Sequence, residues 1–234
     1  NYDFAAQRST LKADQQTLNY FVIDRIKKAL DVVLFNGVPT CRSALPGGSD
    51  SDCKPYNAFK TGAVTQAALD YLQAPGLQTG TVDQEVYTLT FTGDLNGYGV
   101  KLPAAEEGAQ VAFGAEYRRD SLENTTDALL ASAGLSGTGG PTNGLKGATQ
   151  VKDLFFEGRL PLVQGKTFAE SLSLDVAYRY SDYGKINTDT YKLGLEWSPV
   201  SDFRVRGSFQ RAVRAANIIE LFTAQGFGLF DIDG

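Results

Sequence analysis

The catalytic sites that this chain can build are limited, because its 234 residues contain two cysteines and no histidine. The absence of imidazole excludes Ser-His-Asp and Cys-His nucleophilic sites and metal sites built on histidine. Lys and Arg total 22 against 27 Asp and Glu, which gives a formal net charge of −5. An acidic chain of this kind lacks the basic surface expected of a nucleic-acid-binding protein. We therefore predict that the protein is not an enzyme, holds no cofactor and binds no nucleic acid.

Two polar segments have compositions that also occur in ion-binding and phosphate-binding loops. Asp50 and Asp52 stand between serines and offer the oxygen ligands that calcium prefers, but their spacing lacks the Gly and Glu positions of an EF-hand loop. The glycines between positions 137 and 147 are not followed by the Lys-Ser/Thr pair of a phosphate-binding loop. We interpret both segments as solvated loops and predict no metal site.

Most of the remaining charged residues alternate with apolar ones, and this alternation predicts strands. In 171–181, apolar residues occupy the even positions, and polar or charged residues occupy most of the odd ones. A period of two is the signature of a β-strand with one apolar and one polar face. The same pattern predicts seven strands, near 1–8, 84–94, 109–119, 150–162, 170–182, 190–198 and 203–212. The charged residues of the predicted polar faces include Glu116, Arg118, Glu157, Arg159, Asp175, Arg179, Glu196, Arg204 and Arg206.

The connections between these strands differ strongly in length. Residues 198–202 form a tight turn and 163–169 a short link, whereas the loops 9–83 and 120–149 are long. If these seven strands form an antiparallel meander, the shorter links of this chain fall at one end of the sheet and the longest at the other. This is the plan of an outer-membrane β-barrel.

Two segments of the first long loop have helical spacing. Apolar residues at positions 23, 26, 30 and 33 predict one helix. Thr65 is a candidate N-cap for a second helix, which extends through Leu72 and stops before Pro75. We interpret both helices as packing the loop against itself rather than as ligand-binding elements.

The positions of the aromatic residues favour a membrane barrel over a soluble β-sandwich, whose strands also alternate. On the predicted apolar face, five tyrosines lie towards the long-loop ends, and Trp197, Phe203, Phe91 and Tyr2 lie towards the short-turn ends. The residues between them are mostly Leu, Val, Ala and Gly. A bilayer favours this order, because amphipathic rings prefer the water interface on either side of an aliphatic band. We expect the apolar faces to contact lipid and the polar faces to line a wet lumen.

Seven strands leave two open sheet edges. An unpaired edge within hydrocarbon leaves backbone groups unsatisfied, and single-chain bacterial barrels have even strand counts. We therefore expect residues 1–234 to be one partial β-barrel domain, an all-β antiparallel meander that belongs to a larger transmembrane barrel.

Motifs in the second half of the chain resemble those of TonB-dependent outer-membrane receptors. The runs 178–184 and 190–199 are similar to the mid-barrel region of that family. The strand 203–211 and the residues that follow it resemble the family motif RGSYSRGFRAPSLAELY. Ala216 stands where the family usually has proline, which predicts a less rigid entry into the loop. Residues 111–119 and the stretch 41–70 resemble the larger-loop members.

The resemblance implies a 22-stranded barrel with a plugged lumen and long extracellular loops that contain short helices. It implies an outer-membrane receptor of a Gram-negative bacterium that takes up a scarce nutrient, such as an iron–siderophore, cobalamin or a glycan. Its partners would be that nutrient, outer-membrane lipid and the TonB complex, reached through a plug region that we expect to lie outside these residues. The alternatives are a structural or adhesive outer-membrane protein and, disfavoured by the missing histidine, an outer-membrane enzyme.

Six charged residues are candidates for contact with an anionic ligand: Arg211, Arg214, Glu220, Arg179, Arg204 and Arg206. The first three lie at the family motif, where we favour pairing within the loop over contact with a ligand. The other three, together with Arg118 and Arg159, lie on predicted polar faces, where they could guide an anionic ferric chelate towards the lumen. They could equally pair with carboxylates on neighbouring strands, which is the default for facing charges on a sheet.

Cys41 and Cys53 are the only cysteines and fall in the loop that we place outside the cell. An oxidising envelope favours a disulfide, which would constrain the loop by roughly 2–3 kcal/mol in the chain-entropy model. We expect mass spectrometry of envelope-derived protein, without reductant, to find neither cysteine as a free thiol. Two free thiols would refute the bridge.

Overall fold

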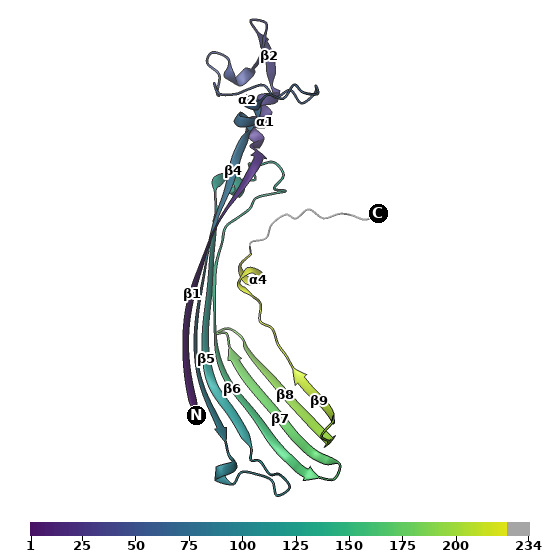
Figure 1. Ribbon diagram of the computed structural model, residues 1–234. Helices are drawn as coiled ribbons and strands as arrows, with labels where there is room; N and C mark the ends of the chain where they lie inside the picture. The colour runs from purple at the N-terminus through teal and green to yellow at the C-terminus, as the bar shows by residue number, and fades with distance from the viewer. Residues whose placement is uncertain (224–234) are drawn as a thin grey trace. The chain divides into compact units, whose positions relative to one another are not determined.

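Seven long strands form one sheet in the computed structural model, which describes residues 1–223 (Figure 1). Their order in the sheet is β1-β4-β5-β6-β7-β8-β9, so consecutive long strands are neighbours in an antiparallel meander, as the sequence predicts. The strands are β1 (Tyr2–Phe21), β4 (Gln73–Asp94), β5 (Gln110–Thr126), β6 (Leu145–Lys166), β7 (Ala169–Asp182), β8 (Asn187–Val200) and β9 (Phe203–Arg211).

Shorter elements lie between these strands. A two-stranded hairpin consists of β2 (Val32–Phe35) and β3 (Val38–Cys41). The helices are α1 (Ile23–Leu30), η1 (Arg42–Ala44), α2 (Gln66–Leu72), η2 (Asn96–Tyr98), α3 (Ala128–Ala131) and α4 (Ile218–Phe222). Within the described residues, no helix combines the length and the apolar character needed to cross a membrane.

The strands extend well into the segments 9–83 and 120–149, which the sequence predicts as loops. β1 continues to Phe21 and β4 already begins at Gln73, while β5 and β6 occupy both ends of the second segment. The extension of β1 is mostly polar and mostly exposed, and its scattered apolar residues, such as Leu11 and Leu18, form no continuous apolar face. Because no apolar face needs to be covered there, the period of two is missing from the sequence, although the strand pairing persists.

The first predicted helix is shorter than expected. α1 ends at Leu30, and Val33 belongs to strand β2 instead. Asn36 and Gly37 both have positive φ and form the two-residue turn of the β2–β3 hairpin. This strong local turn signal outweighs the apolar residue at position 33. The second helix follows its prediction, because the Thr65 side chain accepts a hydrogen bond from the Ala68 N–H at the start of α2.

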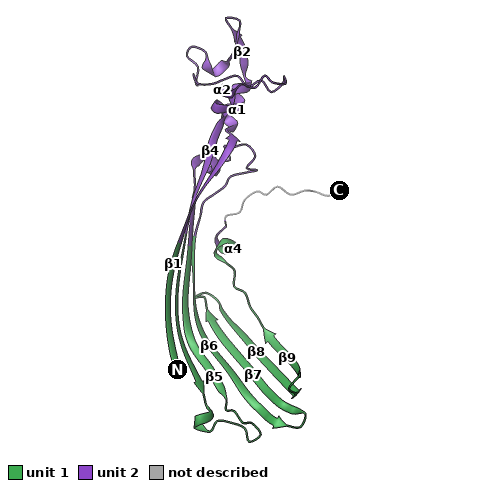
Figure 2. Ribbon diagram, in the orientation of Figure 1, with its two compact units in different colours: residues 1–10, 82–121, 147–221 green, residues 11–81, 122–146, 222–234 purple. Residues whose placement is uncertain are grey.

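The chain divides into two compact units (Figure 2). The first comprises residues 1–10, 82–121 and 147–221. In it, burial is the reverse of that in a soluble sheet: Leu193, Leu195 and Val205 on the apolar face are 44–51% exposed, with no second layer over them. The buried polar residues Asp153, Ser173, Ser181, Glu196 and Ser198 all lie on the opposite, polar face. A sheet that exposes its aliphatic face and buries carboxylates and hydroxyls on the other suits lipid on one side and water on the other.

The second unit contains residues 11–81 and 122–146. One of its buried clusters joins Ala29 of α1 and Leu72 of α2 to both cysteines, and another joins Val22 to Leu130 and Leu135. Cys41 and Cys53 form a disulfide with a Cα–Cα distance of 6.1 Å, and both residues are buried. The bridge ties the end of the hairpin to the loop that precedes α2.

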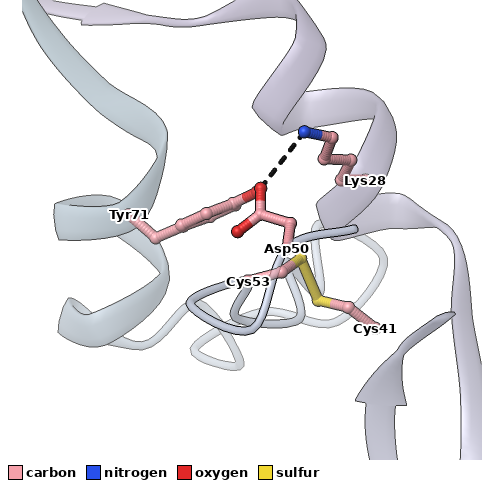
Figure 3. The surroundings of a disulfide bond; sticks show 5 residues. All are labelled: Lys28, Cys41, Asp50, Cys53 and Tyr71. Carbon is pink, nitrogen blue, oxygen red and sulfur yellow. Dashed lines mark hydrogen bonds and ion pairs between the residues drawn. A yellow bond between two sulfur atoms is a disulfide. The ribbon is translucent and has the colours of Figure 1, made fainter. Parts of the chain in front are cut away.

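Asp50 lies in the segment that the disulfide closes, and it connects helices α1 and α2 of this unit (Figure 3). Its Oδ2 accepts hydrogen bonds from the Tyr71 hydroxyl at 2.9 Å and from the Lys28 ammonium at 3.2 Å. These contacts lower the pKa of Asp50, the Tyr71 hydroxyl most of all. Burial and the bond to Asp50 raise the pKa of Tyr71 to about 12. Asp50 is therefore engaged by two donors, and the described residues contain no group of three or more potential metal ligands.

The Asp50 network predicts a specific effect of removing one hydroxyl. Tyr71→Phe keeps the ring but deletes the donor, at a cost of about 1 kcal/mol. Hydrogen–deuterium exchange of the α1, α2 and 42–53 amides should accelerate about fivefold if they open as one cooperative unit. Asp52→Asn is the matched control, because the Asp52 side chain is exposed and only its backbone N–H, which the substitution keeps, interacts with Asp50. Equal exchange in wild type and Tyr71→Phe would contradict a stabilising role for this contact.

Candidate functional site

Three arginines converge on one buried carboxylate on the polar face of β6–β9. Glu196 of β8 faces Ser173 of β7 on one side and Arg206 of β9 on the other. Arg206 Nε lies 2.7 Å from Oε2 of Glu196. Arg159 Nη2 and Arg204 Nε lie 3.4 Å and 3.5 Å from its Oε1. The three side chains come from three positions on β6 and β9, so only the sheet register brings them together.

Exposure differs sharply within this Arg159–Arg204–Arg206 cluster. The Glu196 side chain is 10% exposed, whereas the side chains of Arg159, Arg204 and Arg206 are 44%, 55% and 65% exposed. One carboxylate balances one guanidinium, so the cluster retains two positive charges that face away from the sheet. Exposed ion pairs contribute little stability. Guanidinium groups in this arrangement can bind an anion as well as stabilise the strand pairing.

Arg179 forms a separate, balanced pair. Its Nη1 lies 3.3 Å from Oδ2 of Asp153, whose side chain is only 3% exposed. The Arg179 guanidinium also lies over the Phe155 ring at 5.4 Å. Gly114 permits that ring position, because a Cβ there would stand 2.7 Å from the Phe155 ring edge. The cation–π contact and the ion pair together hold the Arg179 side chain against the polar face of the sheet.

Two hollows lie against the same polar face. The larger, about 600 Å³, is lined by residues that include Glu157, Arg159, Asp175 and Lys192. The smaller, about 280 Å³, shares Glu157 and Lys192 and reaches Arg211. Both are lined by charges of both signs, so the polar face offers binding groups beyond the arginine cluster.

Arg214 and Glu220, predicted as ligand-binding residues, bind each other in the segment after β9. Two guanidinium nitrogens lie 3.0 Å and 2.9 Å from the Glu220 oxygens. Asn217 caps α4, because its Oδ1 accepts from the Glu220 N–H while its own N–H donates to Glu220, both at 2.9 Å. The bond from Arg214, followed by that from the Asn217 N–H, lowers the pKa of Glu220. This pair has an intramolecular role in shaping the loop.

The six predicted site residues thus fall into separate groups. Arg204 and Arg206 share Glu196, Arg179 pairs with Asp153, and Arg214 pairs with Glu220. Arg211 ends β9 opposite Tyr191 and lines the smaller hollow. Arg159 was not among the six, although it completes the cluster. Its position on the polar face is visible in the sequence, but its proximity to β9 depends on the pairing of four strands.

Comparison with known proteins agrees with this architecture. The model of the family described as TonB dependent receptor-like, beta-barrel matches residues 14–231. No curated protein and no solved structure matches the chain. The family match covers most of the chain, including the strands that carry the arginine cluster. Together with the meander and its inverted burial, it places the chain in the β-barrel family of TonB-dependent receptors, which are outer-membrane transporters.

Proposed function

We propose that this protein takes up a scarce nutrient across the outer membrane of a Gram-negative bacterium, with energy supplied through the TonB complex. The cargo would be an iron–siderophore, cobalamin or a glycan. The observation that carries the proposal is the inverted burial of the β6–β9 sheet, with exposed aliphatic side chains on one face and buried carboxylate and hydroxyl side chains on the other. A wall of this kind separates lipid from a polar pathway.

The proposed barrel contains more strands than these seven. β1 and β9 are the two edges of the described sheet, and within hydrocarbon each edge needs a partner strand. Closure as a 22-stranded barrel with a plugged lumen is the arrangement that the family suggests. Arg179, Arg204 and Arg206 would then face the lumen, Arg211 would lie at the end of β9 in register with Tyr191 of the apolar face, and the Arg214–Glu220 pair would shape a loop near the ligand. The function is that of a receptor and transporter rather than of an enzyme.

Substitution on the apolar face tests the proposed contact with lipid. Leu193 is 51% exposed, so in a water-soluble sheet Leu193→Arg would be nearly harmless. Facing hydrocarbon, the same change should destabilise the barrel by roughly 2–4 kcal/mol, measured by denaturant unfolding in lipid vesicles. Ser208→Arg is the matched control, since Ser208 faces Gly194 on the polar side of the sheet. Equal stability of the two variants would contradict the assignment of the faces.

Uptake assays test the transport function itself. Deleting the gene for this receptor should abolish growth on its nutrient under limitation, and deleting TonB should do the same. Growth would be scored on ferric siderophores, cobalamin and oligosaccharides as sole limiting sources. Receptor loss that impairs surface attachment while leaving all uptake intact would support the adhesive alternative and overturn the proposal.

A further inference from the structure

We propose that Arg159, Arg204 and Arg206 form a binding site for an oxyanion group, a carboxylate or a phosphate, carried by a solute that moves along the polar face. The inference rests on the proposed transport function, because it requires this face to line a solute pathway. It adds the chemical class of the cargo and a role for the cluster that neither the family match nor the sequence motifs assign.

The first argument is charge. Three guanidiniums lie within 3.5 Å of a single carboxylate, Glu196. Asp175 faces Arg159 in the register of β6 and β7, yet the Arg159 guanidinium reaches Glu196 instead. With Asp175 counted as well as Glu196, three positive charges still stand against two negative ones. The surplus is concentrated at one point of the wall, where it would attract an anion from the pathway.

The second argument is the availability of donors. Each guanidinium carries five N–H groups in a planar fork that matches the oxygens of a carboxylate or phosphate. The contacts with Glu196 use few of them, and Arg204 adds one bond at 3.4 Å to the Ser198 hydroxyl. The remaining donors belong to side chains that are about half exposed. They are therefore accessible to an incoming oxyanion.

The third argument is preorganisation. Glu196 is nearly covered and holds three long side chains at one place, so it acts as a positioning residue for the site. Restraint of rotamers before binding reduces the entropy lost when a ligand arrives. Ser173 faces Glu196, is 2% exposed, and its hydroxyl has no hydrogen-bond partner within the described structure. A further polar group therefore lies at the floor of the cluster.

The fourth argument is space. Arg159 also lines the larger hollow of about 600 Å³, together with Lys192, a further cation on the same face. A solute group bound by the cluster can thus extend its remaining atoms into this hollow. The volume lies within the range of small-molecule sites.

Equilibrium dialysis of the full-length receptor in detergent, at low ionic strength, tests the site with radiolabelled citrate and inorganic phosphate. Wild type should bind at least one of the two saturably, and added salt should weaken the binding. Arg204→Gln combined with Arg206→Gln should weaken it about tenfold, the loss expected for removed charge-assisted bonds. Glu196→Gln should weaken it about threefold, because the carboxylate that holds the three guanidiniums in place is gone.

Arg118→Gln is the matched control, since Arg118 pairs with Asp120 and lies outside the cluster. It should leave the affinity unchanged. Arg159→Gln alone serves if the double variant does not fold, and should weaken binding about threefold. A purely structural cluster predicts lower thermal stability of Glu196→Gln with no change in anion affinity. That result, or a folded wild type that binds neither anion, overturns the proposal.

Different results would reject the oxyanion site and the transport function. Receptor-dependent nutrient uptake without anion binding rejects the oxyanion site and leaves the transport function standing. Saturable anion binding that depends on the cluster, in cells where deletion of the receptor alters no uptake, rejects transport and retains the site.

Discussion

The opposed solvation of the two faces of the sheet is the constraint on which the rest of this structure depends. A strand can bury its backbone polar groups only through pairing with its neighbours, so the long strands follow one another in an unbroken meander. Once the pairing is fixed, the period of two sends every second side chain to the same face. Aliphatic residues such as Leu193 and Leu195 gather on one face and charged residues such as Glu196 on the other.

The same constraint explains why the charges on the polar face are paired so closely. A carboxylate sheltered against a sheet is costly unless charged donors reach it. One arginine forms an ion pair with Asp153, and three arginines form ion pairs with Glu196. The excess at Glu196 is more than stability requires, because a single well-placed guanidinium neutralises the carboxylate. The proposed oxyanion site rests on this excess.

The unit that contains the disulfide follows ordinary rules for a water-exposed domain. It has buried apolar clusters, capped helices and a cross-link, and Asp50 joins α1 to α2 through Lys28 and Tyr71. A small cluster of buried residues gives limited stability on its own, and disulfides commonly supplement it in extracellular proteins. These contacts give the segment a folded structure in place of a flexible loop.

The sequence by itself determined the strand-rich class, the assignment of each side chain to a face, and the Thr65 cap, because these depend on local periodicity and local hydrogen bonds. It did not determine where the strands end beyond the apolar band. Residues 9–21 carry no alternation, and only pairing with β4 shows them to be strand. It also did not show which arginines share Glu196, or fix the geometry of the Arg214–Glu220 pair. Those relationships were decided by tertiary structure, because cross-strand register and the Asn217 cap place the partners, and register is a property of the whole sheet.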